Sequence, residues 1–155
     1  MTITHRELCV LAAKYLKNNG IIPFQKAKYV VCELERQGES PDAFGFGYCT
    51  QLIEVKVSRS DFLSDKKKYW RKYPQRGLGM YRSYLCPSGM INVEELPDGW
   101  GLLYYDNGKI DVVKKPEEQE SCHRSEIALI SSILRREGIA SQIFSYKKYK
   151  KKEQK

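Results

Sequence analysis

The sequence has no run of 18 apolar residues, the length that a membrane-spanning helix requires, so we expect no membrane span and no membrane partner. The N-terminal residues also lack the apolar core of a secretory signal peptide. Of the 155 residues, 41% are hydrophobic and 30% are charged, which is typical of a globular protein and not of a disordered or fibrous one. We therefore expect a cytoplasmic globular protein.

Cysteine pairs of the CxxC type, which hold zinc or carry out redox chemistry, are also absent. The cysteines are widely spaced and odd in number, and they are Cys9, Cys32, Cys49, Cys86 and Cys122. Cys9 and Cys32 lie within apolar runs, and we expect both to be buried as small hydrophobic residues. Cys122 and His123 are adjacent, but the chain has only two histidines and these spacings do not match the usual zinc-ligand patterns. We expect no zinc site.

A phosphate-binding loop is missing as well. Gly45 and Gly47 flank Phe46, but the basic residue and the helix that complete such a loop do not follow them. We also expect no small-molecule cofactor.

Positive charge exceeds negative charge, with 27 lysines and arginines against 19 aspartates and glutamates and a net charge of +8. The last ten residues hold six lysines and one glutamate and so carry +5, which leaves +3 for the other 145 residues. A basic segment of this kind can bind phosphate backbones, and it also occurs as a solvated, solubilising tail. We expect one domain over residues 1–145, followed by a flexible basic tail over residues 146–155.

A second basic cluster, residues 66–73, mixes cations with aromatic rings. Such a mixture suits phosphates and exposed bases. Tyr69, Trp70 and Tyr73 are spaced so that they share one face of a helix, however, and this spacing favours packing against a sheet over stacking with bases.

The pattern of apolar residues predicts an alternation of helices and strands. Helices are expected at 4–18, 60–73 and 122–137, and strands at 28–36, 43–48, 51–57, 80–86, 100–105 and 109–113. Thr4 and Glu7 have the spacing of a capping box at the start of the first helix, and Asn107-Gly108 predicts a hairpin. The last helix has an apolar stripe of Ile127, Ile130, Ile133 and Leu134, and Gly138 ends it. This order predicts a single α/β domain.

Two carboxylates and a lysine form the most informative group in the chain. Side chains alternate faces along a strand, so Glu54 and Lys56 point to the same face and Val55 to the opposite one. Asp42 precedes the neighbouring strand, and we expect it to lie beside them. Mg²⁺ prefers carboxylate oxygens, and a lysine nearby can align a water or stabilise charge on a phosphate. An acid-x-Lys triplet also occurs by chance on exposed strands, but the apolar residues around this one predict an interior strand.

The sequence around this group resembles the PD-(D/E)XK nuclease superfamily, whose signature corresponds to Pro41-Asp42 and Glu54-x-Lys56. Residues 54–67, EVKVSRSDFLSDKK, are similar to the segment E-(I/V)-K-x-S-x-x-D-F-x-x-D-x-K of the MmcB-like group of DNA-repair endonucleases. Further similar segments are residues 84–87, 95–97 and 101–103. The resemblance spans about half the chain and implies a restriction-endonuclease-like fold, with a central mixed β-sheet flanked by helices.

The resemblance implies a metal-dependent hydrolysis of DNA phosphodiester bonds. Asp42 and Glu54 would ligate Mg²⁺ or Mn²⁺, with the Val55 carbonyl as a further oxygen ligand. Lys56 would orient the attacking water and stabilise the developing charge. The superfamily also has an upstream acidic residue, for which Glu33 is the first choice; Glu35 and Glu7 are the alternatives.

Further residues are expected to contact DNA. Ser58 lies on the face of Glu54 and Lys56, where it could bind a phosphate oxygen. Asp61, Asp65 and Lys66 could support the site from the following helix, although helix capping and surface ion pairing are alternatives. The lysines of the tail that we expect to bind DNA are Lys147, Lys148, Lys150 and Lys151.

The expected function is therefore that of a deoxyribonuclease acting in DNA repair or processing. Two alternatives belong to other classes: a nucleic-acid-binding module that kept the fold without turnover, and an adaptor whose tail binds an acidic partner. A homodimer is compatible with cleavage of two strands, but no sequence feature identifies a dimer face.

Overall fold

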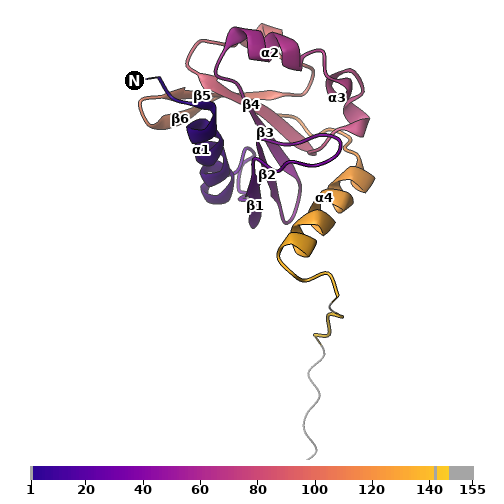
Figure 1. Ribbon diagram of the computed structural model, residues 1–155. Helices are drawn as coiled ribbons and strands as arrows, with labels where there is room; N and C mark the ends of the chain where they lie inside the picture. The colour runs from indigo at the N-terminus through magenta and orange to yellow at the C-terminus, as the bar shows by residue number, and fades with distance from the viewer. Residues whose placement is uncertain (1, 142, 147–155) are drawn as a thin grey trace, which may run out of the picture.

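A six-stranded mixed β-sheet forms the centre of the computed structural model, which describes residues 2–141 and 143–146 (Figure 1). The α-helices are α1 (His5–Asn18), α2 (Arg59–Asp65), α3 (Tyr69–Lys72) and α4 (His123–Arg136), and two short 3₁₀ helices are η1 (Pro74–Arg76) and η2 (Val93–Glu95). The strands are β1 (Tyr29–Cys32), β2 (Ala43–Phe46), β3 (Gln51–Val55), β4 (Tyr81–Pro87), β5 (Gly101–Asp106) and β6 (Lys109–Lys114). The expected single α/β fold, with a central mixed sheet flanked by helices, is confirmed.

The strands follow one another across the sheet in the order of the sequence. β1, β2 and β3 pair antiparallel, β3, β4 and β5 pair parallel, and β5 and β6 form an antiparallel hairpin. The hairpin turns at Asn107-Gly108, where both residues have positive φ angles of 44° and 85°, as the sequence predicts. The three parallel strands all end at the same edge of the sheet, and this edge carries the site described below.

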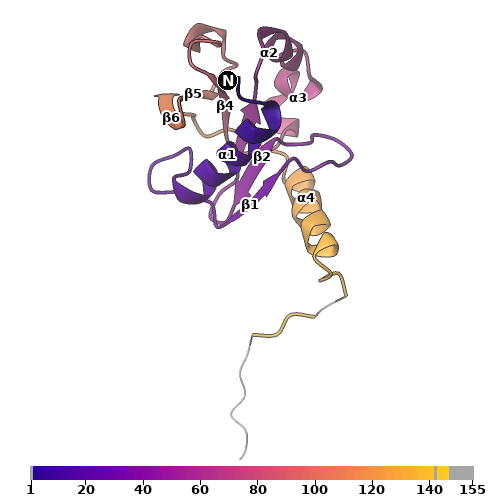
Figure 2. The same ribbon diagram turned by 60° about the vertical axis from the view of Figure 1, so that its left-hand side comes forward.

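Helices cover both faces of the sheet (Figures 1 and 2). On one face, Leu8, Cys9 and Ala12 of α1 pack against β2, β3 and β4. On the other face, Phe62 of α2 and Leu129 of α4 join a second core on the same strands. Because Val55 belongs to the first core while Leu52 belongs to the second, Glu54 and Lys56 lie on the face of α2.

Local features at the N-terminal end of the chain agree with the sequence. Thr4 caps α1, and its side chain and that of Glu7 form the predicted capping box. Cys9 is fully buried, whereas Cys32 is only half-buried. Gly45 is needed for packing, because a Cβ atom there would lie 2.6 Å from the Cβ of Ala27.

The prediction of one continuous helix over residues 60–73 is wrong. The chain forms α2, then turns at residues 66–68 and forms the separate one-turn helix α3. This break turns Arg71 into the interior and leaves Tyr69 and Tyr73 50% and 40% exposed. The prediction that the aromatic residues of this segment form part of the core is therefore wrong for the two tyrosines.

Two other predicted elements differ from the structure. The first strand ends at Cys32 instead of Arg36, because Glu33 has a φ of 52° and leaves the extended conformation. The predicted stripe of α4 is only partly covered, since Ile127 is 67% exposed while Leu129, outside the stripe, is buried.

The predicted tail lies outside the described residues except for Tyr146. Within residues 2–141 and 143–146, no helix is long and apolar enough to cross a membrane.

Candidate functional site

A pocket of about 340 Å³ lies where β3 ends and the N-terminus of α1 approaches the start of β2. Polar and charged side chains dominate its walls. The lining residues are His5, Ser40, Asp42, Glu54, Val55, Lys56, Asp61, Ser64, Asp65 and Lys68. The structure therefore brings together Asp42, Glu54 and Lys56, as the sequence predicts.

Asp42 is positioned by the pairing of β2 with β3. Ala43 of β2 pairs with Ile53 of β3 in this antiparallel ladder, so Asp42 and Glu54 occupy the next pair of opposing positions. The backbone N–H of Val55 donates a hydrogen bond of 2.8 Å to Oδ2 of Asp42. The other oxygen, Oδ1, lies 3.5 Å from Nε2 of His5. Asp42 is thus oriented through one oxygen and offers the second to a ligand.

Lys56 lies between two buried carboxylates. Its Nζ is 3.4 Å from Oε2 of Glu54 and 3.2 Å from Oδ1 of Asp65. Burial lowers the pKa of Lys56, but the charges of Glu54 and Asp65 outweigh it, and the net pKa is raised above its ordinary value. Lys56 therefore carries a positive charge at neutral pH.

Burial and a neighbouring negative charge disfavour the ionised form of Glu54. It is 2% exposed, and burial together with the charge of Asp42 raises its pKa to about 8. Its Oε1 is buried and accepts no hydrogen bond from the described residues; the nearest cation, the guanidinium of Arg71, is 3.6 Å away. A carboxylate with an unsatisfied, buried oxygen has the capacity to bind a cation.

A buried ionic network supports Lys56 from the side of α2 and α3. Arg71 donates to Asp65 at 2.8 Å and to Glu39 at 3.0 Å, and its guanidinium lies over the ring of Trp100 at 4.5 Å. Tyr84 of β4 donates a 2.5 Å hydrogen bond to Asp65. Burial raises the pKa of Asp65, but Arg71 and Lys56 reverse this effect and leave it well below the ordinary value.

Sequence reasoning missed three members of this network: Glu39, Arg71 and Tyr84. Each is far from the signature in sequence or was assigned to another role, and only their burial reveals them. It also missed His5, which reaches Asp42 from the first turn of α1. No local sequence pattern pairs these three residues with one another, and none pairs His5 with Asp42.

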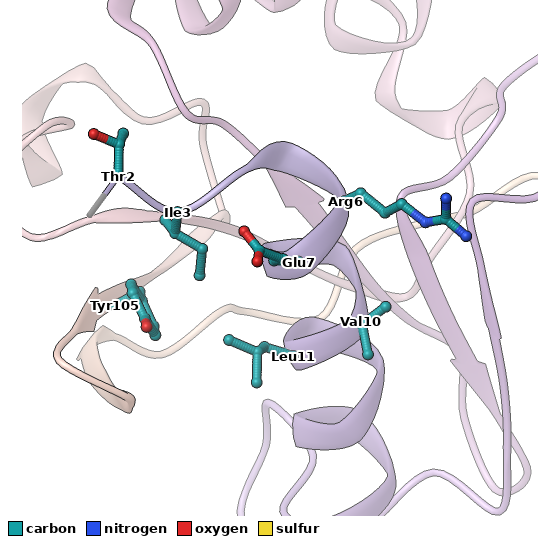
Figure 3. Close-up of a pocket in the computed structure, with 7 residues that line it drawn as sticks. All are labelled: Thr2, Ile3, Arg6, Glu7, Val10, Leu11 and Tyr105. Atoms are coloured by element: carbon teal, nitrogen blue, oxygen red, sulfur yellow. The ribbon is translucent and has the colours of Figure 1, made fainter.

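The structure does not bring the expected upstream glutamates into the pocket. Glu33 is exposed, and its backbone N–H donates to the carbonyl of Asp42. Glu35 is exposed too, and Glu7 binds the capping residue Thr4. Glu7 lines a different hollow of about 580 Å³, in which Ile3, Leu11 and Tyr105 gather while Arg6 extends away (Figure 3). Within the described residues, His5 occupies the place beside Asp42 that an upstream glutamate was expected to fill.

Two residues that are predicted to contact DNA also make contacts within the protein. Ser58 is the N-cap of α2, and its hydroxyl accepts a hydrogen bond from the backbone of Asp61. Lys66 is exposed, and its ammonium lies 5.4 Å from the ring centre of Phe62. Lys147, Lys148, Lys150 and Lys151 lie outside the described residues.

Comparisons with known proteins do not indicate a function. No family model matches the chain, and no curated protein does so either. One solved structure that is similar to the chain is SPO1766, a protein of unknown function from Silicibacter pomeroyi. It is 24% identical, the match covers 75% of this chain and 84% of that chain, and the TM-score is 0.48. The function must therefore be inferred from the site.

Proposed function

We propose that the protein is a metal-dependent nuclease of the PD-(D/E)XK type that hydrolyses DNA phosphodiester bonds. The observation that carries this proposal is the convergence of Asp42, Glu54 and Lys56 in one pocket at the end of β3. Two carboxylates that can hold a metal ion, together with a charged lysine that can contact a phosphate, are a minimal set for metal-assisted hydrolysis. A role in DNA repair or processing is part of the same proposal and follows from the sequence resemblance alone.

The carboxylates suit Mg²⁺ or Mn²⁺. Asp42 has one oxygen that accepts no hydrogen bond from the backbone, and Glu54 has a buried oxygen without a donor among the described residues. Asp42 and Glu54 would hold the ion, with the carbonyl of Val55 as a further ligand. When bound, such an ion polarises the phosphate and makes a bound water more acidic.

Lys56 supplies positive charge. Because its pKa is raised, its ammonium cannot accept a proton at neutral pH, which excludes it as a general base in the metal-free protein. It can donate hydrogen bonds to a phosphate oxygen or to the attacking water. Asp65 holds this ammonium in place, and Arg71 holds Asp65.

A basic and aromatic surface adjoins the pocket. Lys68 lines the pocket and is the N-cap residue of α3, and Lys66, Lys67 and Lys72 nearby are exposed. The exposed rings of Tyr69 and Tyr73 lie 4.9 Å apart between their centres. Cations beside exposed rings suit a DNA strand with accessible bases, which supports DNA as the substrate.

Cleavage of plasmid and single-stranded DNA with Mg²⁺ or Mn²⁺ tests the proposal. We expect Glu54→Gln and Lys56→Met to abolish cleavage while DNA binding is retained, and the exposed Glu94→Gln to leave both unchanged. Binding without cleavage on duplex, branched and single-stranded DNA would overturn it in favour of a non-catalytic binding module. A chain that neither binds nor cuts would leave the adaptor.

A further inference from the structure

The side chains of His5, Cys9 and Asp42 form a cluster that the proposed hydrolysis does not explain. His5 and Cys9 are four residues apart in α1 and so lie on the same side of the helix, while Asp42 comes from the segment that precedes β2. One candidate ligand atom from each of the three residues lies within 4.8 Å of the other two. Imidazole, thiol and carboxylate thus meet at one point beside the pocket.

Two distances within this cluster are close to those of a tetrahedral metal centre. Nε2 of His5 lies 3.9 Å from Sγ of Cys9 and 3.5 Å from Oδ1 of Asp42. In a tetrahedral zinc site the corresponding distances are about 3.6 Å for sulfur to nitrogen and about 3.4 Å for nitrogen to oxygen, given the usual zinc–ligand bond lengths. These two distances exceed those of the tetrahedral site by only a few tenths of an ångström.

We propose that His5, Cys9 and Asp42 form a binding site for a divalent transition-metal ion of the Zn²⁺ class. Thiolate and imidazole ligands select such ions over Mg²⁺, which prefers oxygen. On binding, the metal replaces the thiol proton of Cys9, and this proton is released to solvent. Because His5 and Asp42 line the pocket, a water molecule from the pocket would serve as the fourth ligand.

The position of Asp42 gives this site a consequence for the proposed nuclease. Its Oδ2 is held by Val55, so the same Oδ1 would serve either the Zn²⁺-class ion or an ion shared with Glu54. The two metals would therefore compete for Asp42, and Zn²⁺ would inhibit Mg²⁺-dependent cleavage. The binding site itself does not depend on the nuclease proposal.

Cobalt provides a direct probe of this site. We expect the metal-free, full-length protein to bind one Co²⁺ per chain, with visible absorption bands of a tetrahedral centre and an ultraviolet charge-transfer band from the thiolate, and Zn²⁺ to displace it. Cys9→Ser should remove the charge-transfer band. His5→Gln should weaken Co²⁺ binding by about tenfold or more, and the 43% exposure of the His5 side chain makes this variant safe for folding.

The matched control is the double variant Cys122→Ser/His123→Gln, which removes a cysteine and a histidine from outside the cluster. We expect it to keep the spectrum and the affinity of the wild-type protein. The proposal is overturned if the wild-type protein shows no thiolate band, if the band persists in Cys9→Ser, if His5→Gln binds Co²⁺ as tightly as the wild type, or if the control variant loses it. These readouts are independent of DNA cleavage, so they distinguish failure of this site from failure of the nuclease.

Discussion

Nζ of Lys56 lies 3.2 Å from Oδ1 of Asp65, and both side chains are buried. Asp65 is in turn held by Arg71, so the lysine of the signature depends on a residue 15 positions later in the chain.

We expect Asp65→Asn to lower kcat for DNA cleavage with little change in KM, because Asp65 positions Lys56 and does not contact the substrate. A loss of DNA binding in this variant, with kcat unchanged, would contradict this role.

Removal of Arg71 should destabilise the protein strongly. Arg71→Ala removes the buried cation that binds both Glu39 and Asp65, which costs about 3–5 kcal/mol of the free energy of unfolding. The adjacent Lys72 is exposed, and Lys72→Ala should change this free energy by less than about 0.5 kcal/mol. Urea denaturation of both variants measures the difference, and equal stabilities would show that the network contributes little.

The metal-free protein should lose stability as the pH rises from about 4.5 to about 8. The pKa of Glu54 is raised from 4.5 to about 8 in the folded state, so in this range the folded chain holds a proton that the unfolded chain has released. Stability therefore falls with increasing pH. Glu54→Gln should flatten this slope, while Glu94→Gln should keep it. Thermal unfolding in the presence of a chelator at several pH values provides the measurement.

The exposed Tyr69 of α3 and Tyr73, which follows α3, should favour DNA with unpaired bases. We expect Tyr69→Ala to weaken single-stranded DNA binding by about 1–3 kcal/mol, with a smaller effect on duplex DNA. Tyr48 is 87% exposed and lies at the connection between β2 and β3, so Tyr48→Ala is a matched control. Fluorescence anisotropy at fixed salt tests this prediction, and equal losses on both DNA forms would argue against stacking.

Deletion of residues 146–155 should weaken DNA binding and reduce its salt dependence. The segment carries a net charge of +5, and each phosphate contact adds about 0.7 to 0.9 to the slope of log K against log salt. An unchanged slope would identify this segment as a solubilising tail.

The strand signature could be read from the sequence because it depends on local alternation. The period of two places Glu54 and Lys56 on one face and Val55 on the other, and the capping box and the hairpin turn are equally local. The α/β class follows from the order of such elements. The location of Asp42 beside Glu54 requires only the pairing of neighbouring strands.

The rest of the site depends on contacts between distant segments. The run from Ser60 to Tyr73 has the composition of one continuous helix, but Arg71 reaches Asp65 and Glu39 only because the helix is interrupted. One of the ion pairs that this interruption allows is with Glu39, which lies 32 positions before Arg71. Likewise, His5 approaches Asp42 through the packing of α1 on the sheet, which no local pattern encodes.

The interruption between α2 and α3 places Tyr69 outside and Arg71 inside within a single turn of helix. A residue that faces solvent and a residue that completes the interior are therefore only two positions apart. Random substitution of this turn would seldom alter one property alone, and libraries aimed at new DNA preferences would lose many members to misfolding. Substrate preference would be easier to engineer at the exposed Lys67 and Lys72 than at Lys68, which forms an ion pair with the buried Asp65.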